Sequence, residues 1–174
     1  APGCVVVPVN KVTEGAACTV LLAEKYINND DELMIANSDQ YVDCDINEYI
    51  KALRDYDGLI MTMYAGDDKW SYIAFDNQKL VTMVREKEVI SNEATVGIYN
   101  FKHGKEFVNY AHKMIELDLR VKDEFYVAPV YNMLIDDAKK IVFYNIGSVG
   151  AGMYGLGVPE DLNAFLSCPI SEKF

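Results

Sequence analysis

The sequence predicts an α/β fold in which helices flank a mixed, mostly parallel sheet. Short apolar runs alternate with segments of helical periodicity in the first half of the chain. Later, two strand-like runs are joined by Asp76-Asn77-Gln78, which indicates a hairpin and therefore some antiparallel pairing. The 174 residues show neither an internal repeat nor a linker, so residues 1–174 are expected to form a single domain.

The chain begins with a predicted strand and a predicted helix. Val5-Val6-Val7-Pro8-Val9 is β-branched, and its proline places the strand at an edge, because proline cannot donate to a ladder. Thr13 is expected to cap a helix from Glu14 to Ile27. The small residues Gly15-Ala16-Ala17 would let either a flat ligand or a neighbouring backbone approach the first turn, and a helix N-terminus favours phosphate.

The most informative stretch runs from Glu32 to Asp45. Leu33-Met34-Ile35-Ala36 is an apolar run between polar residues, which predicts a strand buried on both faces. Ligands of open α/β sheets bind beyond the carboxyl ends of strands, and Asn37-Ser38-Asp39-Gln40 follows this strand directly. Asp39 is therefore a candidate ligand for a divalent metal. The alternative is that Asp39 only starts a turn.

Asp43-Cys44-Asp45 has two interpretations. The pattern D-x-D is a metal-binding signature of many nucleotide-sugar glycosyltransferases, although it is a common tripeptide. Asp45 with Glu48 also fits a capping box for a helix that ends near Arg54. We favour the capping interpretation.

The remaining elements follow from periodicity and turn residues. Two helices are expected after the hairpin, over 106–119 and beyond Glu124-Phe125-Tyr126, with Pro129 near the first turn of the second. A last helix opens at Val158-Pro159-Glu160-Asp161, after a glycine-rich loop over 147–157. Strands are expected over residues 58–65, 70–75, 79–85, 94–101 and 141–146.

Composition excludes several classes of function. The net charge of −11 disfavours non-specific binding of nucleic acid and of anionic membrane surfaces. Four widely spaced cysteines and two histidines make a zinc site improbable, and free thiols suggest a reducing cytoplasm. No apolar run approaches the roughly 20 residues that span a bilayer.

Taken in order, several of these pieces resemble the sugar-phosphate nucleotidyltransferases of the glucose-1-phosphate thymidylyl-, uridylyl- and cytidylyltransferase type. The resemblance covers about Val5 to Leu166. It implies a Rossmann-like fold of the GT-A type, Mg²⁺ as cofactor, and a cytoplasmic enzyme. It further implies transfer of a nucleotidyl group from a nucleoside triphosphate to a sugar phosphate, or a related phosphorylated small molecule, with release of pyrophosphate. Such products are precursors of cell-surface polysaccharides, including capsules.

The resemblance also assigns site residues. A Gly-Thr-Ala-type turn beside the base matches Gly15 and Ala16. The magnesium-binding Asp at a strand end matches Asp39 in LMIANSDQ, with Gln40 beside it as a substrate-binding residue. A Glu-Lys-Pro-like segment matches Glu86-Lys87-Glu88, so Lys87 would hold the sugar phosphate. Gly97 in ATVGIYNF would lie near the sugar, and Glu124 would bind its hydroxyl groups.

Two features depart from the family pattern. The family's second metal-binding Asp would stand at Gly155, in MYGLGVPEDL, so metal binding is expected to be weaker or to use another carboxylate. The phosphate-binding Gly-rich loop with its Arg and Pro-Lys-Pro is not found after the first strand, and neither the spacing G-x-G-x-x-G nor Pro-Lys-Pro is expected elsewhere in the chain. We therefore expect a fragment truncated at its N-terminus, inactive by itself and able to form a homo-oligomer.

Two other functions stay open at this point. One is a nucleotide-sugar glycosyltransferase of related α/β architecture that uses Asp43 and Asp45. The other is a non-catalytic module that binds a sugar or a nucleotide and has lost one metal ligand.

Overall fold

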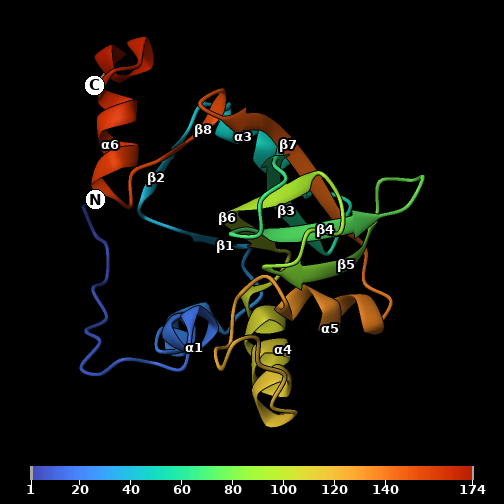
Figure 1. Ribbon diagram of the computed structural model, residues 1–174. Helices are drawn as coiled ribbons and strands as arrows, with labels where there is room; N and C mark the ends of the chain where they lie inside the picture. Colours follow the sequence, from blue (N-terminus) through green and yellow to red (C-terminus); the bar gives the residue numbers. More distant parts are fainter. Residues whose placement is uncertain (1, 174) are drawn as a thin grey trace.

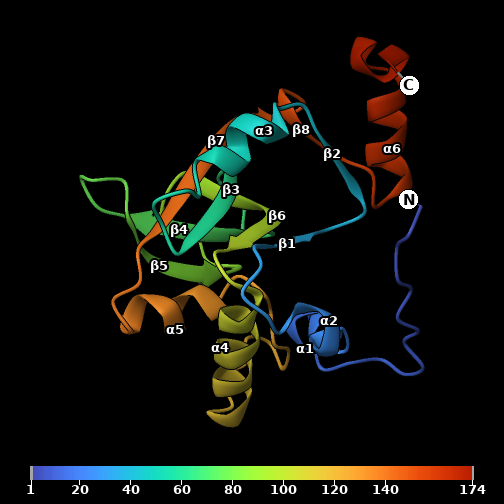
Figure 2. The same ribbon diagram turned by 180° about the vertical axis from the view of Figure 1, so that it is seen from behind.

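The computed structural model describes residues 2–173 and shows one sheet with helices on both sides (Figures 1 and 2). Its strands are β1 (Leu33–Ala36), β2 (Gln40–Val42), β3 (Gly58–Tyr64), β4 (Ser71–Phe75), β5 (Val81–Glu86), β6 (Glu93–Phe101), β7 (Ile141–Val149) and β8 (Gly152–Gly155). Its helices are α1 (Ala16–Leu21), α2 (Glu24–Ile27), α3 (Ile46–Lys51), α4 (Gly104–Glu116), α5 (Val130–Asp136) and α6 (Pro159–Leu166), followed by the short 3-10 helix η1 (Pro169–Lys173).

The sheet has the order β2-β8-β7-β3-β6-β4-β5, and β1 lies off this path beside β6. The pairs β3–β7 and β7–β8 are parallel. The pairs β1–β6, β2–β8, β3–β6, β4–β5 and β4–β6 are antiparallel. The predicted mixed sheet with flanking helices is confirmed. The sheet is not mostly parallel as predicted. It contains more antiparallel than parallel pairs, because the long strand β6 runs antiparallel to β1, β3 and β4.

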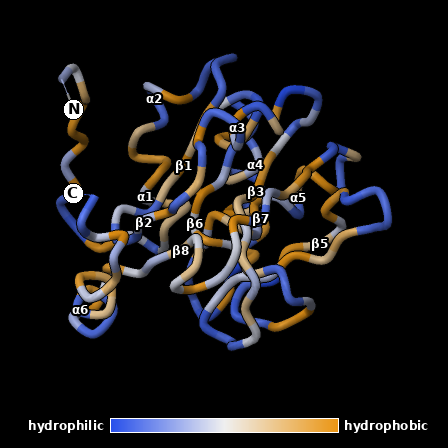
Figure 3. The backbone as a smooth tube through the Cα atoms, turned by 90° about the horizontal axis from the view of Figure 1, so that it is seen from above, coloured by the Kyte–Doolittle hydropathy of each residue, from blue (hydrophilic) through white to orange (hydrophobic). Residues whose placement is uncertain are grey.

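Two apolar cores lie on opposite faces of the sheet. One contains α1, α4 and α5, with Phe107 and Tyr131 packed against Phe101 of β6. The other contains Tyr49 of α3, whose hydroxyl donates to Oδ1 of the buried Asn100 at 2.6 Å. In Figure 3, hydrophobic residues are concentrated along β3, β6 and β7, and hydrophilic residues lie in the loops at the periphery. The central strands are therefore apolar on both faces, as the sequence runs indicate.

The strand Leu33–Ala36 is where the sequence predicts it, but its burial differs from the prediction. β1 is half-buried rather than covered on both faces, and Met34 is 37% exposed. The reason is that β1 pairs with β6 alone among the strands that the structure describes. An edge strand with one neighbour keeps part of its apolar surface in contact with solvent.

The first segment of the chain also differs from the prediction. Residues 4–10 form no strand, and Val6 is 82% exposed. This run has the composition of a strand but no neighbouring strand to pair with. The predicted helix from Glu14 to Ile27 is interrupted by a turn at Leu22-Ala23, and Gly15 rather than Thr13 is its N-cap. In Figures 1 and 2 this first segment and α6 both project from one side of the sheet.

Several later elements agree with the sequence. Asp45 caps α3 by accepting the backbone N–H groups of Asn47 and Glu48, and β4 and β5 form the predicted hairpin. The glycine-rich segment over 147–157 is not simply a loop, because β7 continues to Val149 and β8 occupies Gly152–Gly155. The sequence does not indicate strands in this segment, because glycine is depleted in strands.

None of the helices in residues 2–173 combines the length and the apolar character that a membrane crossing requires.

Candidate functional site

A cavity of about 420 Å³ lies at the carboxyl end of β1. Three elements that are distant in the sequence meet there: the first turn of α1, the end of β5 and the middle of β6. Ligand sites in proteins usually occupy roughly 300–1,000 Å³, so this cavity can hold a small molecule. It is lined by Ala16, Val20, Ile35, Ala36, Asn37, Lys69, Trp70, Ser71, Glu86, Lys87, Thr95, Val96, Gly97, Tyr99, Tyr126, Val127 and Ala128.

Lys87 is held in place by contacts of both its backbone and its side chain. It adopts a left-handed conformation with φ of 55° directly after β5. Its backbone N–H donates to the carbonyl oxygen of Trp70 at 3.0 Å. Its Nζ donates to the hydroxyl of Tyr126 at 3.0 Å and lies 5.0 Å from the centre of that ring. The hydrogen bond to Tyr126 raises the pKa of Lys87, so this cation is fixed at the cavity wall.

Glu86 stands beside Lys87 in a different environment. Burial raises the pKa of the Glu86 carboxyl, although Ser71 donates its hydroxyl to it. Glu124 is exposed and does not line the cavity, but its charge contributes to the raised pKa of Lys87. Glu124 thus acts on Lys87 through its charge and is not part of the cavity wall.

The two small residues predicted at the base-binding turn have different positions. Ala16 lines the main cavity. Gly15 has φ of 120°, and a Cβ atom there would overlap the backbone of Phe125. The backbone N–H of Phe125 donates to the carbonyl of Glu14 at 2.8 Å, and that of Ala17 donates to the carbonyl of Phe125 at 2.9 Å. Gly15 thus permits a close approach of backbone, the second of the two predicted uses of this turn.

Gly97 lies in the cavity wall on β6, with φ of 78°. A side chain at this position would collide with the amide of Asn37. The backbone N–H of Asn37 donates to the carbonyl of Gly97 at 3.0 Å. The glycine therefore leaves room for Asn37 at the carboxyl end of β1.

A second, smaller cavity of about 250 Å³ adjoins the first. Asn37 and Trp70 line both cavities, so the two are neighbours. The smaller one lies between the turn after β1 and the segment that joins β8 to α6. It is lined by Asn37, Asp39, Gln40, Trp70, Met153, Gly155, Gly157, Val158 and Asp161. The predicted site residues are thus divided: Ala16, Lys87 and Gly97 lie in the main cavity, and Asp39 and Gln40 in the smaller one.

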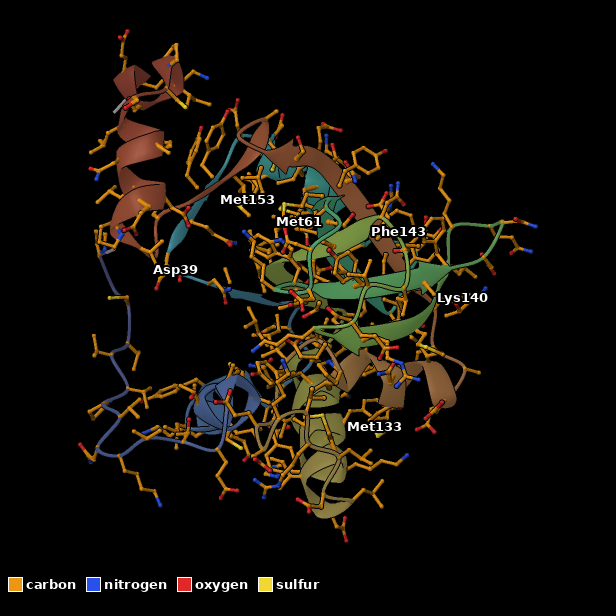
Figure 4. The ribbon with its side chains drawn as sticks, viewed as in Figure 1. Asp39, Met61, Met133, Lys140, Phe143 and Met153 are labelled. Atoms are coloured by element: carbon orange, nitrogen blue, oxygen red, sulfur yellow. The ribbon has the colours of Figure 1, made fainter. Side chains whose placement is uncertain are left out.

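Asp39 is exposed at the turn between β1 and β2, on the side of the molecule that carries α6 (Figure 4). Its carboxylate makes no hydrogen bond or ion pair with any residue that the structure describes. A Cβ atom at Gly157 would lie 2.7 Å from Oδ2 of Asp39, and one at Gly155 would lie 2.9 Å from Oδ2 of Asp161. Asp161 is therefore the carboxylate that approaches the position of Gly155.

A metal ion would depend on ligands from outside the protein. In residues 2–173, no three His, Cys, Asp or Glu side chains lie close enough together to hold a metal. Mg²⁺ commonly uses one or two carboxylates and completes its shell with water and substrate phosphates. An unpaired carboxylate such as that of Asp39 fits this mode of binding.

The spacing G-x-G-x-x-G does occur, contrary to expectation, from Gly150 to Gly155. These glycines form the turn between β7 and β8 and then β8 itself. A phosphate loop must instead connect a strand to the N-terminus of a helix. The segment therefore lacks the geometry that would cradle a phosphate.

Asp43 and Asp45 do not line either of these cavities. Asp45 is the N-cap of α3. Asp43 accepts a hydrogen bond from the hydroxyl of Tyr41 at 3.2 Å and lies 3.7 Å from Nζ of Lys173. The capping interpretation of this tripeptide is thus confirmed for Asp45.

Three residues of the site were not predicted from the sequence: Asn37, Trp70 and Tyr126. Asn37 follows the predicted strand Leu33–Ala36 and Tyr126 follows Glu124, but the sequence motifs assign neither residue a role. The hydrogen bond between Lys87 and Tyr126 spans 39 positions, and no local pattern indicates such a contact. Trp70 is the single tryptophan of the chain. This rarity is the one feature of the sequence that could have pointed to it as a site residue.

The sequence model of the nucleotidyl transferase family matches residues 4–140. The chain belongs to this family. The match confirms the nucleotidyltransferase resemblance seen in the sequence motifs. A comparison with curated proteins gives no match.

Solved structures of related nucleotidyltransferase folds resemble the chain at low identity. A nucleoside-diphosphate-sugar pyrophosphorylase from Vibrio cholerae has a TM-score of 0.76 and 24% identity, over 92% of this chain and 68% of that one. A protein described as a glucose-1-phosphate thymidylyltransferase from Bacillus anthracis, in complex with sucrose, has a TM-score of 0.69 and 16% identity, over 90% and 61%. HddC from Yersinia pseudotuberculosis has a TM-score of 0.58 and 19% identity, over 90% and 62%. These likenesses confirm the fold, and this chain spans roughly two thirds of the length of each.

Proposed function

We propose that this nucleotidyltransferase transfers a nucleotidyl group from a nucleoside triphosphate to a sugar phosphate, or to a related phosphorylated small molecule, and releases pyrophosphate. The observation that carries the proposal is the meeting of Ala16, Gly97 and Lys87 around one cavity at the carboxyl end of β1. Activated sugars of this kind supply the synthesis of cell-surface polysaccharides. Four free cysteines agree with a cytoplasmic location.

The reaction requires positioning and neutralisation of charge more than covalent catalysis. An oxygen of the sugar phosphate attacks the α-phosphorus and forms a new P–O bond. The bond from the α-phosphorus to the bridging oxygen breaks, and pyrophosphate leaves with that electron pair. Lys87 would hold the attacking phosphate through its ammonium group, and Tyr126 would orient Lys87.

The other residues have supporting roles in this proposal. Asp39 would hold Mg²⁺, which supplies positive charge to the phosphates when it is bound. Ala16 would lie against the base, Gly97 would leave space at the sugar, and Glu124 would bind sugar hydroxyl groups.

A glycosyltransferase that uses Asp43 and Asp45 is less well supported, because Asp45 is occupied as a helix cap. A binding module without catalysis would use the same cavity and would differ only in lacking turnover. The binding module is an outcome of the assay that follows.

The test is release of pyrophosphate from UTP, dTTP or CTP in the presence of glucose 1-phosphate, with and without Mg²⁺. It is run on the 174-residue chain, which we expect to be inactive by itself, and on any longer form of the protein that contains this chain. Release that requires both Mg²⁺ and the sugar phosphate supports the proposal. Binding of both substrates without release would indicate a binding module and contradict it.

A further inference from the structure

Asn132 in α5 makes two hydrogen bonds to a single residue of β5. Its Oδ1 accepts the backbone N–H of Val84 at 2.8 Å, and its Nδ2 donates to the carbonyl oxygen of Val84 at 2.9 Å. β5 is the last strand of the sheet and pairs with β4 along one side. Backbone groups on the other side of such a strand need partners that no strand supplies. The amide of Asn132 takes the place of a neighbouring strand, because an amide carries both a donor and an acceptor.

This contact joins the two parts of the chain that carry Lys87 and Tyr126. Lys87 directly follows β5, the strand that contains Val84. Tyr126 stands shortly before α5, and residues 127–128 between them are buried. Nζ of Lys87 and the hydroxyl of Tyr126 are 3.0 Å apart. Their hydrogen bond therefore depends on how α5 lies against β5, which Asn132 helps to fix.

Asn132 does not line the main cavity. It lines a separate cavity of about 310 Å³, together with Val84 and Glu86. Glu86 lines both cavities, so the two meet at the end of β5. Asn132 is thus placed to influence a ligand of the main cavity through Lys87 and not by touching the ligand.

We propose that Asn132 is a positioning residue: by pairing with Val84 it fixes α5 against the end of β5 and so sets the hydrogen bond between Tyr126 and Lys87. This inference rests on the proposed function, in which Lys87 holds the attacking phosphate of the sugar phosphate. It adds a residue outside the cavity on which the placement of that ammonium group depends.

The pKa of Lys87 gives a readout that does not depend on a substrate. The hydrogen bond to Tyr126 is the main cause of its raised pKa, and the charges of Glu86 and Glu124 add to it. Replacing Asn132 by a neutral residue leaves both carboxylates in place. If the hydrogen bond to Tyr126 is weakened, the pKa of Lys87 should fall toward its ordinary value of 10.5. NMR titration of Cε of Lys87 in the 174-residue chain measures this change.

Two neutral variants remove the contact. Asn132→Ala should keep α5 intact, because alanine favours helix, and Asn132→Leu keeps a branched side chain of similar size. Faster amide exchange of Val84 shows in each variant that the hydrogen bond is lost. Asn109→Ala is the matched control, because Asn109 is exposed in α4. It should change neither the exchange of Val84 nor the pKa of Lys87.

Binding measures the consequence for the substrate. Calorimetry on the forms of the protein used in the pyrophosphate assay should show about 3- to 10-fold weaker binding of glucose 1-phosphate by both Asn132 variants. That loss corresponds to one weakened hydrogen bond. Binding of UTP should not change, whereas a role in stability alone would affect both ligands equally. In a Tyr126→Phe background, which lacks the hydroxyl, Asn132→Ala should have no further effect on the pKa of Lys87 or on binding of glucose 1-phosphate.

The inference is overturned if Asn132→Ala leaves the exchange of Val84 unchanged, or accelerates it while Lys87 keeps its pKa. Equal weakening of both ligands, or a full effect of Asn132→Ala in the Tyr126→Phe background, would also overturn it. A fall in the pKa of Lys87 without binding of glucose 1-phosphate by any form of the protein would support the positioning of Lys87 and contradict the proposed function. The inference and the proposed function can therefore fail separately.

Discussion

Glu86 and Lys87 are adjacent in the chain, yet the protein affects their charges in opposite ways. Burial disfavours the charged form of Glu86 and raises its pKa. The hydrogen bond to Tyr126 favours the charged form of Lys87 and also raises its pKa. Near neutral pH, Lys87 is therefore a firmly held cation, whereas ionisation of Glu86 costs free energy.

The raised pKa of Glu86 predicts a dependence of stability on pH. Its pKa is higher in the folded chain than the ordinary value of 4.5, so the folded state binds the proton more tightly than the unfolded state. The contribution to stability is fully present below pH 4.5 and is lost as the pH rises through the raised pKa. Glu86→Gln should remove this loss and raise the melting temperature relative to wild type above that pH. Thermal unfolding at several pH values measures it; Glu88→Gln, on an exposed carboxyl, is the control and should leave the profile unchanged.

Lys87 should affect the second substrate more than the nucleotide. Lys87→Ala removes a charged hydrogen-bond donor, so the KM for the sugar phosphate should rise about 10- to 100-fold. Kinetics of the active protein, with each substrate varied in turn, separate the two effects. Lys11→Ala replaces an exposed lysine outside both cavities and should change neither KM. Equal loss for both substrates, or no loss, would mean that Lys87 is only a surface charge.

Asp39 should affect turnover through the metal. Asp39→Asn keeps the shape of the side chain and removes its charge, so turnover should fall about 10²- to 10³-fold, a typical effect of losing one focused electrostatic group. The dependence of turnover on Mg²⁺ concentration should shift at the same time. Near-normal turnover with an unchanged Mg²⁺ requirement would reject the assignment.

At the residue scale, the sequence indicated which residues line the candidate cavities better than it indicated their contacts. Asp39, Gln40, Lys87 and Gly97 were predicted from motifs, and the structure places each in the wall of one of two adjoining cavities. Tyr126 was not predicted, because its contact with Lys87 depends on how α5 and the preceding loop pack against β5. Such contacts follow from tertiary structure and leave no local pattern.

At the scale of elements, α3 shows a cap that the sequence predicts and the structure confirms. Asp45 accepts two backbone N–H groups at the start of α3, and α3 places Tyr49 against β6. Asp45→Ala should lower the free energy of unfolding by about 1 kcal/mol, as measured by chemical denaturation. Asp55→Ala, on an exposed side chain after the same helix, is the control. A changed Mg²⁺ requirement in Asp45→Ala would instead favour the glycosyltransferase interpretation.

The sequence predicts best those elements that local hydrogen bonds between side chain and backbone stabilise. The cap of α3 and the turn Asp76-Asn77-Gln78 of the β4–β5 hairpin both use side chains that bind nearby backbone. The run Val5–Val9 was misassigned because strand propensity cannot form a strand without a neighbour. The strand β8 was missed for the opposite reason: its glycines have low propensity, but β2 and β7 provide partners.

At the scale of the whole molecule, the sheet leaves β1 exposed along one side. β1 pairs with β6 and with no other described strand, and Met34 and Ala36 are exposed on it. The exposed valines of residues 4–10 form a β-branched segment that pairs with nothing in the described structure. An apolar edge and an unpaired apolar segment both favour association with another chain.

We therefore expect the 174-residue chain to self-associate through β1. Pairing at this edge would satisfy backbone groups and bury apolar side chains, each worth roughly 1.5–3 kcal/mol when fully buried. Sedimentation over a range of concentrations should show species heavier than the 19.6 kDa monomer. Met34→Lys should shift the equilibrium toward monomer, because a charge on an edge strand opposes pairing. Leu117→Lys changes an exposed apolar residue after α4 and should leave it unchanged. A clean monomer at all concentrations, or equal effects of the two variants, would contradict association at β1.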